Sequence, residues 1–107
     1  MKKRVLFICG KARQRSPTAD EIFRNEPSID TDFAGLSDDA DVVLSVDQIE
    51  WATDIAVMEK RQISRLKTKY ANHLKGKRII SLDVPDDYTF MQPELVVLLQ
   101  SRRGRVS

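Results

Sequence analysis

One cysteine, one arginine and a serine–proline pair stand close together near the start of the sequence. Arg15 follows Cys9 after five residues, and Ser16 and Pro17 come next. A cysteine thiolate is a strong nucleophile, and the planar guanidinium of arginine can bind two oxygens of one anion. Nucleophilic attack on a bound oxyanion ester is therefore a chemistry that these residues are suited to perform.

The segments around this motif predict that it forms an anion site. Residues 4–9 contain a continuous apolar run, typical of a strand buried on both faces, and Ser16-Pro17 is typical of an N-cap and a first helical residue. Backbone N–H groups in such a turn, together with the positive end of the helix, bind anions and favour the thiolate of Cys9. A small buried cysteine is the simpler alternative. We expect the phosphate-binding residues to be Gly10, Lys11, Ala12, Arg13, Gln14, Arg15 and Ser16.

Three aspartates follow the apolar run at residues 78–82: Asp83, Asp86 and Asp87. A proton donor at the leaving oxygen of a phosphate ester accelerates its cleavage by about 10²–10⁴-fold. Ligands of open parallel sheets bind at the carboxyl ends of the strands, so this loop and the motif at Cys9 are expected at the same edge. Either Asp86 or Asp87 fits the role, and an acidic surface turn is the alternative interpretation.

The pattern of apolar residues predicts how these two segments are positioned. Strands are expected at residues 4–9, 29–34, 53–58 and 78–82, and helices at 17–25, 47–52, 62–74 and from 92 onward. This alternation is typical of a three-layer α/β fold, a four-stranded parallel sheet with helices on both faces. We expect one domain over residues 1–107, with a frayed tail at residues 102–105.

Composition narrows the class of protein further. The 107 residues are 41% hydrophobic, and 18 Lys and Arg stand against 16 Asp and Glu, which excludes a disordered polyelectrolyte. No apolar run approaches the length of about 18 residues that a membrane span requires, and the apolar stretch after the basic start is too short for a signal peptide. We therefore expect a cytoplasmic protein. One cysteine and one histidine make a poor zinc site, so no metal or other cofactor is expected.

The motif at Cys9 resembles the N-terminal signature of the low-molecular-weight protein tyrosine phosphatases, an apolar strand followed by C-x5-R-S-P and a helix. The resemblance continues through residues 18–20, 34–36 and 49–52 and covers most of the chain, which is shorter than the usual members. It implies the fold of that family. It also implies that Cys9 forms a phosphocysteine intermediate, that Arg15 binds the phosphoryl group and that Ser16 steadies the thiolate.

The family's acid lies in an Asp-Pro-Tyr motif, and an alignment on Tyr88 matches Asp86 to that acid, with Asp87 in place of the proline. Tyr88 is expected at the rim of the cleft, where it would stack on an aromatic leaving group. The loop departs from the family pattern in three places: Lys11 and Ala12 replace glycine and asparagine, and Gln14 replaces a second cysteine. Lys11 and Arg13 either favour a multiply charged substrate or are simply solvated.

The resemblance implies a phosphatase that acts on phosphotyrosine or an aryl phosphate, with a phosphorylated protein or a small phosphate ester as its partner. A pseudo-phosphatase, or a protein that recognises RNA ends or nucleotide and cyclic phosphates, is the alternative. Arsenate reduction needs further thiols, and a phosphate-carrying transport subunit has no need of Arg15. The basic residues between 60 and 78 leave RNA binding open, although a solvated helix face is the expected interpretation. No membrane partner is expected, and the oligomeric state stays open.

Overall fold

A four-stranded parallel sheet lies at the centre of the computed structural model, which describes residues 2–106. The strands are β1 (Lys3–Cys9), β2 (Ile29–Gly35), β3 (Asp54–Val57) and β4 (Arg78–Ser81), in the order β2-β1-β3-β4. The helices are α1 (Arg15–Phe23), α2 (Val46–Trp51), α3 (Lys60–Tyr70), α4 (Pro93–Ser101) and α5 (Arg103–Val106), with a 3₁₀ turn at Ala71–His73. The parallel sheet expected from the sequence is confirmed.

Strand β1 is an interior strand and carries the cysteine. Residues 5–8 have no exposed surface, because β2 and β3 pair with the strand on its two sides and helices cover its two faces. The register places Cys9 opposite Gly35 of β2 and Ile8 opposite Val57 of β3. The carboxyl ends of these three strands therefore meet at one edge of the sheet, where the predicted site lies.

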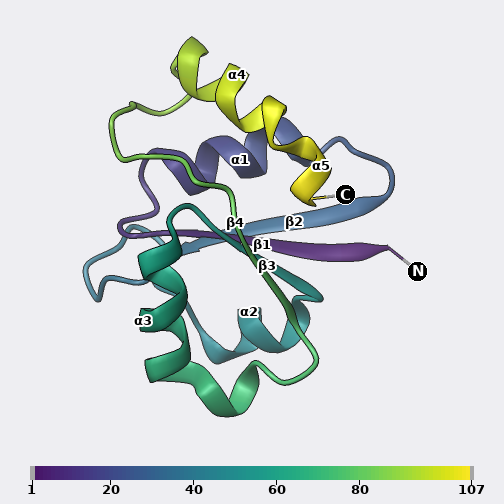
Figure 1. The fold of residues 1–107 in the computed structure, drawn as a ribbon, viewed down its shortest axis with the longest axis vertical. Coiled ribbons are helices and arrows are strands. Elements are labelled where there is room, and N and C mark those ends of the chain that lie inside the picture. The colour runs from purple at the N-terminus through teal and green to yellow at the C-terminus, as the bar shows by residue number, and fades with distance from the viewer. Residues whose placement is uncertain (1, 107) are drawn as a thin grey trace.

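The helices form a layer on each side of the sheet (Figure 1). Helices α1, α4 and α5 cover one face, where the rings of Phe7 and Phe23 stack with centroids 5.7 Å apart. Helices α2 and α3 cover the other face and bury Ile49 and Leu66 against β1 and β3. Burial of these apolar side chains is the main source of stability, and it confirms the three-layer α/β architecture.

The C-terminal residues expected to be frayed are instead held against the sheet. Val106 at the end of α5 is 1% exposed and belongs to the same core as α1 and α4. Arg102 Nε donates to the carbonyl oxygen of Leu82 at 2.9 Å, and Arg105 Nη1 donates to that of Ser81 at 3.0 Å. The expectation for residues 102–105 was wrong because these acceptors lie 20 and 24 positions earlier in the chain, beyond the reach of a local pattern.

The expected N-cap of α1 was also wrong. The helix begins at Arg15 after Gln14, and no side chain caps it. Ser16 lies in the first turn, fully buried, and its hydroxyl contacts Cys9 rather than the helix N–H groups. The serine–proline pair marks the start of the helix correctly, but the Ser16 hydroxyl contacts the Cys9 sulfur instead of capping the helix.

The limits of α3 differ modestly from those predicted. The helix begins at Lys60 rather than near Gln62, because Glu59 and Gln62 form a reciprocal capping box. It ends at Tyr70, and the 3₁₀ turn covers the rest of the segment predicted as helix up to Leu74. Gly76 then reverses the chain with φ +76°, a conformation that glycine adopts readily. None of the helices in residues 2–106 has the length and apolar character needed to cross a membrane.

Candidate active site

The loop from Gly10 to Gln14 wraps around the sulfur of Cys9. Cys9 is 3% exposed, and its Sγ lies 3.0 Å from the hydroxyl oxygen of Ser16 and accepts a hydrogen bond of 3.2 Å from the N–H of Ala12. Ala12 has φ +58°, a left-handed conformation that turns its N–H toward the sulfur and costs about 1 kcal/mol for a residue other than glycine. One N–H donor and one hydroxyl group thus contact the same sulfur atom, and a hydroxyl turned toward a thiolate donates to it and stabilises its charge.

Several backbone N–H groups of this loop are available to a bound anion. Among residues 2–106, the N–H groups of Gly10, Lys11, Arg13 and Gln14 donate no hydrogen bond. The N–H groups of Arg15 and Ser16 in the first turn of α1 also lack helical acceptors, and no side chain caps them. A row of unbonded N–H groups next to a helix N-terminus attracts an oxyanion.

A second segment, residues 35–41, holds the loop in place through backbone hydrogen bonds. The N–H groups of Leu36, Ser37 and Asp41 donate to the carbonyl oxygens of Cys9, Gly10 and Lys11 at 2.9, 3.0 and 2.9 Å, in that order. Gly35 permits this close approach, since a Cβ at that position would lie 2.6 Å from the carbonyl oxygen of Gly10. With its carbonyl groups bonded outward, the loop can present its N–H groups inward.

The Arg15 side chain is buried, and hydrogen bonds occupy Nη1 of its guanidinium. Its side chain is 5% exposed, and Nη1 donates to Glu59 Oε1 at 2.5 Å and to the carbonyl oxygen of Val84 at 2.8 Å. Nε and Nη2 donate no hydrogen bond to any residue between 2 and 106, and Asp86 Oδ1 is 3.8 Å from Nε. That free edge is the part of a guanidinium that can grip two oxygens of one phosphoryl group.

Glu59 is a site residue that the sequence analysis missed. It lies two residues after the end of β3, so it is at the same edge of the sheet as Cys9, and it anchors Arg15. The hydrogen bond from Arg15 lowers the pKa of Glu59, and Arg61 adds to this effect, whereas partial burial opposes it. Glu59 therefore stays ionised at neutral pH. An acidic residue at the carboxyl end of the third predicted strand was the available signal.

The loop after β4 brings Asp86 to the site. Asp86 Oδ1 lies on the free edge of the Arg15 guanidinium, and the Asp86 side chain is 64% exposed. Asp87 is also exposed and forms no ion pair within residues 2–106. Tyr88 packs against the core formed by α1 and α4, so its ring is half-buried at this end of the loop.

Both ends of this loop are fixed to the rest of the site. At its start, the N–H of Val84 donates to the carbonyl oxygen of Met58 at 2.7 Å, and its own carbonyl accepts from Arg15. At its end, the N–H of Met91 donates to Thr18 Oγ1 at 2.9 Å, and the Thr18 hydroxyl donates to the carbonyl oxygen of Gln14 at 2.6 Å. The loop is therefore tied to the residues that surround Cys9.

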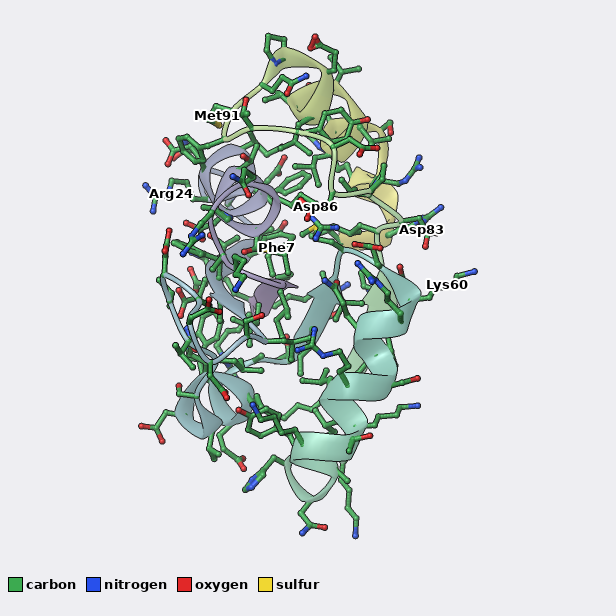
Figure 2. All side chains as sticks on the ribbon, turned by 90° about the vertical axis from the view of Figure 1, so that its left-hand side faces the viewer. Phe7, Arg24, Lys60, Asp83, Asp86 and Met91 are labelled. Carbon is green, nitrogen blue, oxygen red and sulfur yellow. The ribbon has the colours of Figure 1, made fainter. Side chains whose placement is uncertain are left out.

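Asp83 has a structural place in this loop. Its carboxylate accepts hydrogen bonds from Ser81 at 2.8 Å and from Arg105 at 2.8 Å, and these bonds lower the pKa of Asp83. A carboxyl group with a lowered pKa is ionised at neutral pH and cannot donate a proton there. Figure 2 shows Asp83 beside Lys60 at the start of α3, and Asp86 nearer the middle of the molecule.

The two cations of the loop at residues 10–14 are paired rather than free. Lys11 Nζ donates to Asp39, and Arg13 Nε donates to Asp41 Oδ1 at 3.0 Å. The hydrogen bond from Lys11 lowers the pKa of Asp39, and that from Arg13 to Asp41 raises the pKa of Arg13. These ion pairs fasten the loop to residues 37–41 and reduce the cationic character that the sequence suggested.

The arrangement offers a sulfur nucleophile, an anion cradle and a carboxyl group within one site. Cys9 of β1 contacts Ser16 of α1, and the neighbouring Arg15 of α1 pairs with Asp86 of the loop after β4. Among residues 2–106, no group of three or more His, Cys, Asp and Glu side chains gathers in a way that would hold a metal ion.

Comparison with known proteins places the fold in a known class. No family model and no curated protein matches the chain. Solved structures match nearly its whole length. The tyrosine phosphatase Wzb from Escherichia coli K30, in complex with phosphate, superposes with a TM-score of 0.79 at 17% identity, over 99% of this chain and 96% of that chain.

Two further structures match in the same way. The low-molecular-weight protein tyrosine phosphatase SP-PTP from Streptococcus pyogenes has a TM-score of 0.76 at 16% identity, over 100% of this chain and 94% of that one. The YwlE arginine phosphatase from Geobacillus stearothermophilus has a TM-score of 0.75 at 17% identity, over 97% and 92%. The chain therefore has the fold of the low-molecular-weight protein tyrosine phosphatases, as the motif at Cys9 predicted.

Proposed function

We propose that this protein is a cysteine-dependent phosphatase that hydrolyses phosphate monoesters, such as phosphotyrosine or aryl phosphates, through a phosphocysteine intermediate. The observation that carries the proposal is the environment of Cys9. Its sulfur accepts from Ala12 and contacts Ser16, while the free edge of Arg15 and a row of unbonded N–H groups surround the same site. A nucleophile inside an anion cradle is what phosphoryl transfer to sulfur requires.

The first chemical step follows from these positions. The Cys9 thiolate attacks phosphorus, so that a sulfur–phosphorus bond forms and the ester oxygen–phosphorus bond breaks. Nε and Nη2 of Arg15 hold two phosphoryl oxygens, and the loop N–H groups hold the charge that develops. Asp86 donates its proton to the leaving oxygen, a role that suits its place on the free edge of Arg15.

The second step regenerates the enzyme. Water attacks the phosphorus of the phosphocysteine, the Asp86 carboxylate accepts a proton from that water, and the sulfur–phosphorus bond breaks. Inorganic phosphate and the Cys9 thiolate result. Ser16, whose hydroxyl lies 3.0 Å from Sγ, stabilises the thiolate as the leaving group of this step.

Hydrolysis of 4-nitrophenyl phosphate by the unmodified protein and by Cys9→Ser tests the proposal. We expect the substitution to lower kcat by about a thousandfold or more, because a serine hydroxyl is not ionised at neutral pH. Tungstate binding, measured by calorimetry, should remain, since the anion site consists of backbone groups and Arg15. Turnover no faster than that of Cys9→Ser, with anion binding retained, would instead indicate a phosphate-recognising protein.

A further inference from the structure

One edge of the sheet is open. β4 is the terminal strand of the order β2-β1-β3-β4, and Figure 1 shows it in front of the other strands with no helix over it. The N–H groups of Arg78 and Leu82 donate to Thr53 and Val57 on the β3 side. Because successive peptide groups of a strand face opposite directions, those of Ile79 and Ser81 face away from the sheet. They are available to pair with another extended chain.

Two hollows flank this open edge, each with a volume of about 520 Å³. One is lined by Ile63, Ile80 and Ser81 between α3 and α5. The other is lined by Leu74 and Ile79, beside the end of α3. Both hollows are also lined by residues of α3, the first near the start of that helix and the second near its end. The side chains of an added strand alternate between the two faces of a sheet, so a chain paired with β4 would direct every second side chain toward α3 and these hollows.

The hollows carry more cations than anions, although Arg78 is paired with Asp54 and Arg105 with Asp83. Lys60, Arg78 and Arg105 line the first with one carboxylate, Asp83, and three lysines line the second with no acidic residue (Lys67, Lys75 and Lys77). Lys60, Lys67 and Lys75 form no hydrogen bond or ion pair within residues 2–106. Residues 60–78 contain eight Lys and Arg and no acidic residue, whereas the rest of the chain has ten against sixteen.

The chemistry of the lining favours a peptide over a nucleic acid. Single-stranded RNA is held by aromatic side chains on which its bases stack, and neither hollow has an aromatic residue in its lining. The apolar part of both linings is aliphatic. An open strand edge, aliphatic hollows beside it and an excess of cations together suit an extended peptide that alternates aliphatic and acidic side chains.

We propose that the β4 edge and its two flanking hollows bind an acidic, extended segment of a partner protein, which adds to the sheet as a fifth strand. The segment pairs with the N–H and carbonyl groups of Ile79 and with the N–H of Ser81. The Ser81 carbonyl is already occupied by Arg105, which limits the pairing at that end. The surface is separate from Cys9, so the inference does not depend on the proposed catalysis.

The test uses a fluorescent peptide of alternating valine and glutamate, a lysine-for-glutamate version of it and an oligoribonucleotide of equal charge to the first. We expect the unmodified protein to bind the glutamate peptide and not the lysine peptide. Lys67→Glu and Lys75→Glu should each weaken binding about fivefold. Lys2→Glu is the matched control, because it makes the same change in net charge at an exposed residue that precedes β1 and lines neither hollow. It should leave binding unchanged.

Amide hydrogen exchange provides a readout that simple charge attraction would not change. Binding of the glutamate peptide should slow exchange at the N–H groups of Ile79 and Ser81. Unchanged exchange at both groups would overturn strand addition. Tighter binding of the oligoribonucleotide, with the same loss in Lys67→Glu and Lys75→Glu, would overturn the choice of a peptide partner. Equal weakening of peptide binding by Lys2→Glu would show that overall charge alone causes the effect, and it would overturn the proposed site.

Discussion

The guanidinium of Arg15 uses its two edges for different purposes. Nη1 is bonded to Glu59 and Val84, and the edge formed by Nε and Nη2 faces Asp86. A lysine ammonium at this position could satisfy Glu59 but could not also present two parallel donors to a phosphoryl group. We expect Arg15→Lys to lower kcat on 4-nitrophenyl phosphate by about 10²–10³-fold, nearly as much as Arg15→Ala.

Thermal unfolding of both Arg15 variants should accompany these kinetics, since a collapsed site would also lose activity. A folded Arg15→Lys protein with most of its activity would mean that Arg15 acts only as a point charge. The interpretation that Arg15 binds two phosphoryl oxygens through parallel donors would then be wrong.

The choice between Asp86 and Asp87 as proton donor also belongs to single residues. Phenolate needs a proton as it leaves, whereas 4-nitrophenolate leaves readily as an anion. Asp86→Asn should therefore slow phenyl phosphate hydrolysis by about 10²–10⁴-fold and affect 4-nitrophenyl phosphate much less. Asp87→Asn, one residue further from the ion pair with Arg15, should have a small effect on both esters. The opposite pattern would transfer the role to Asp87.

The residues of the site were predictable where local spacing and a resemblance carried the information. Cys9, Arg15 and Ser16 lie within eight consecutive residues, and the strand before them and the helix after them fix their relative positions. Glu59 was not predicted, because its contact with Arg15 spans 44 positions and depends on β3 lying next to β1. Predicting it required the order of the strands, which the apolar pattern alone does not provide.

At the scale of elements, the end of β2 shapes the loop at residues 10–14. A Cβ at Gly35 would lie 2.6 Å from the carbonyl oxygen of Gly10 and 3.0 Å from the backbone nitrogen of Ala12. Gly35→Ala should therefore displace the loop, lower the free energy of unfolding by about 1–3 kcal/mol and reduce kcat. Denaturant unfolding and hydrolysis of 4-nitrophenyl phosphate measure the two effects.

Gly104→Ala is the control for that substitution. A Cβ at Gly104 meets nothing within 4 Å, and alanine is the better helix former in α5. Gly104→Ala should leave kcat unchanged and should not lower the free energy of unfolding. A Gly35→Ala protein as active and stable as Gly104→Ala would show that the loop does not depend on the close approach at Gly35.

The elements themselves were largely predictable, and their contacts were less so. Each strand and the four longer helices were expected at nearly the observed positions, because buried parallel strands and amphipathic helices leave clear local patterns. α5 was missed because its four residues include three that are polar or glycine, and only Val106 reveals its burial. Ser16 was misjudged for a related reason, since its preferred partner is the Cys9 sulfur, seven positions earlier.

At the scale of the whole molecule, ion pairs connect distant segments around the candidate site. Arg15 is bonded to Glu59 after β3, Lys11 to Asp39 after β2, and Arg105 of α5 to Asp83 after β4. In each pair the acidic partner has a pKa below its ordinary value, chiefly through hydrogen bonds to its carboxylate. Protonation of these carboxylates thus weakens the connections of α1, the loop after β1 and α5 to the segments that follow β3, β2 and β4.

The stability of the protein should depend on pH through these carboxylates. The hydrogen bond from Arg15 lowers the pKa of Glu59 in the folded protein relative to the unfolded chain, so the unfolded state binds more protons in the range between the two values. The stabilisation from Glu59 is therefore present above its unfolded pKa and is lost as the pH falls through its folded pKa. Glu59→Gln should lower Tm at about pH 6 and should reduce the further drop in Tm between about pH 6 and pH 3. Asp83 also has a lowered pKa, so Asp83→Asn should likewise reduce the drop in Tm between about pH 6 and pH 3. The effects of the two substitutions should add, because Glu59 and Asp83 pair with different arginines. An unchanged drop in Glu59→Gln would mean that the ion pair with Arg15 contributes nothing to acid stability.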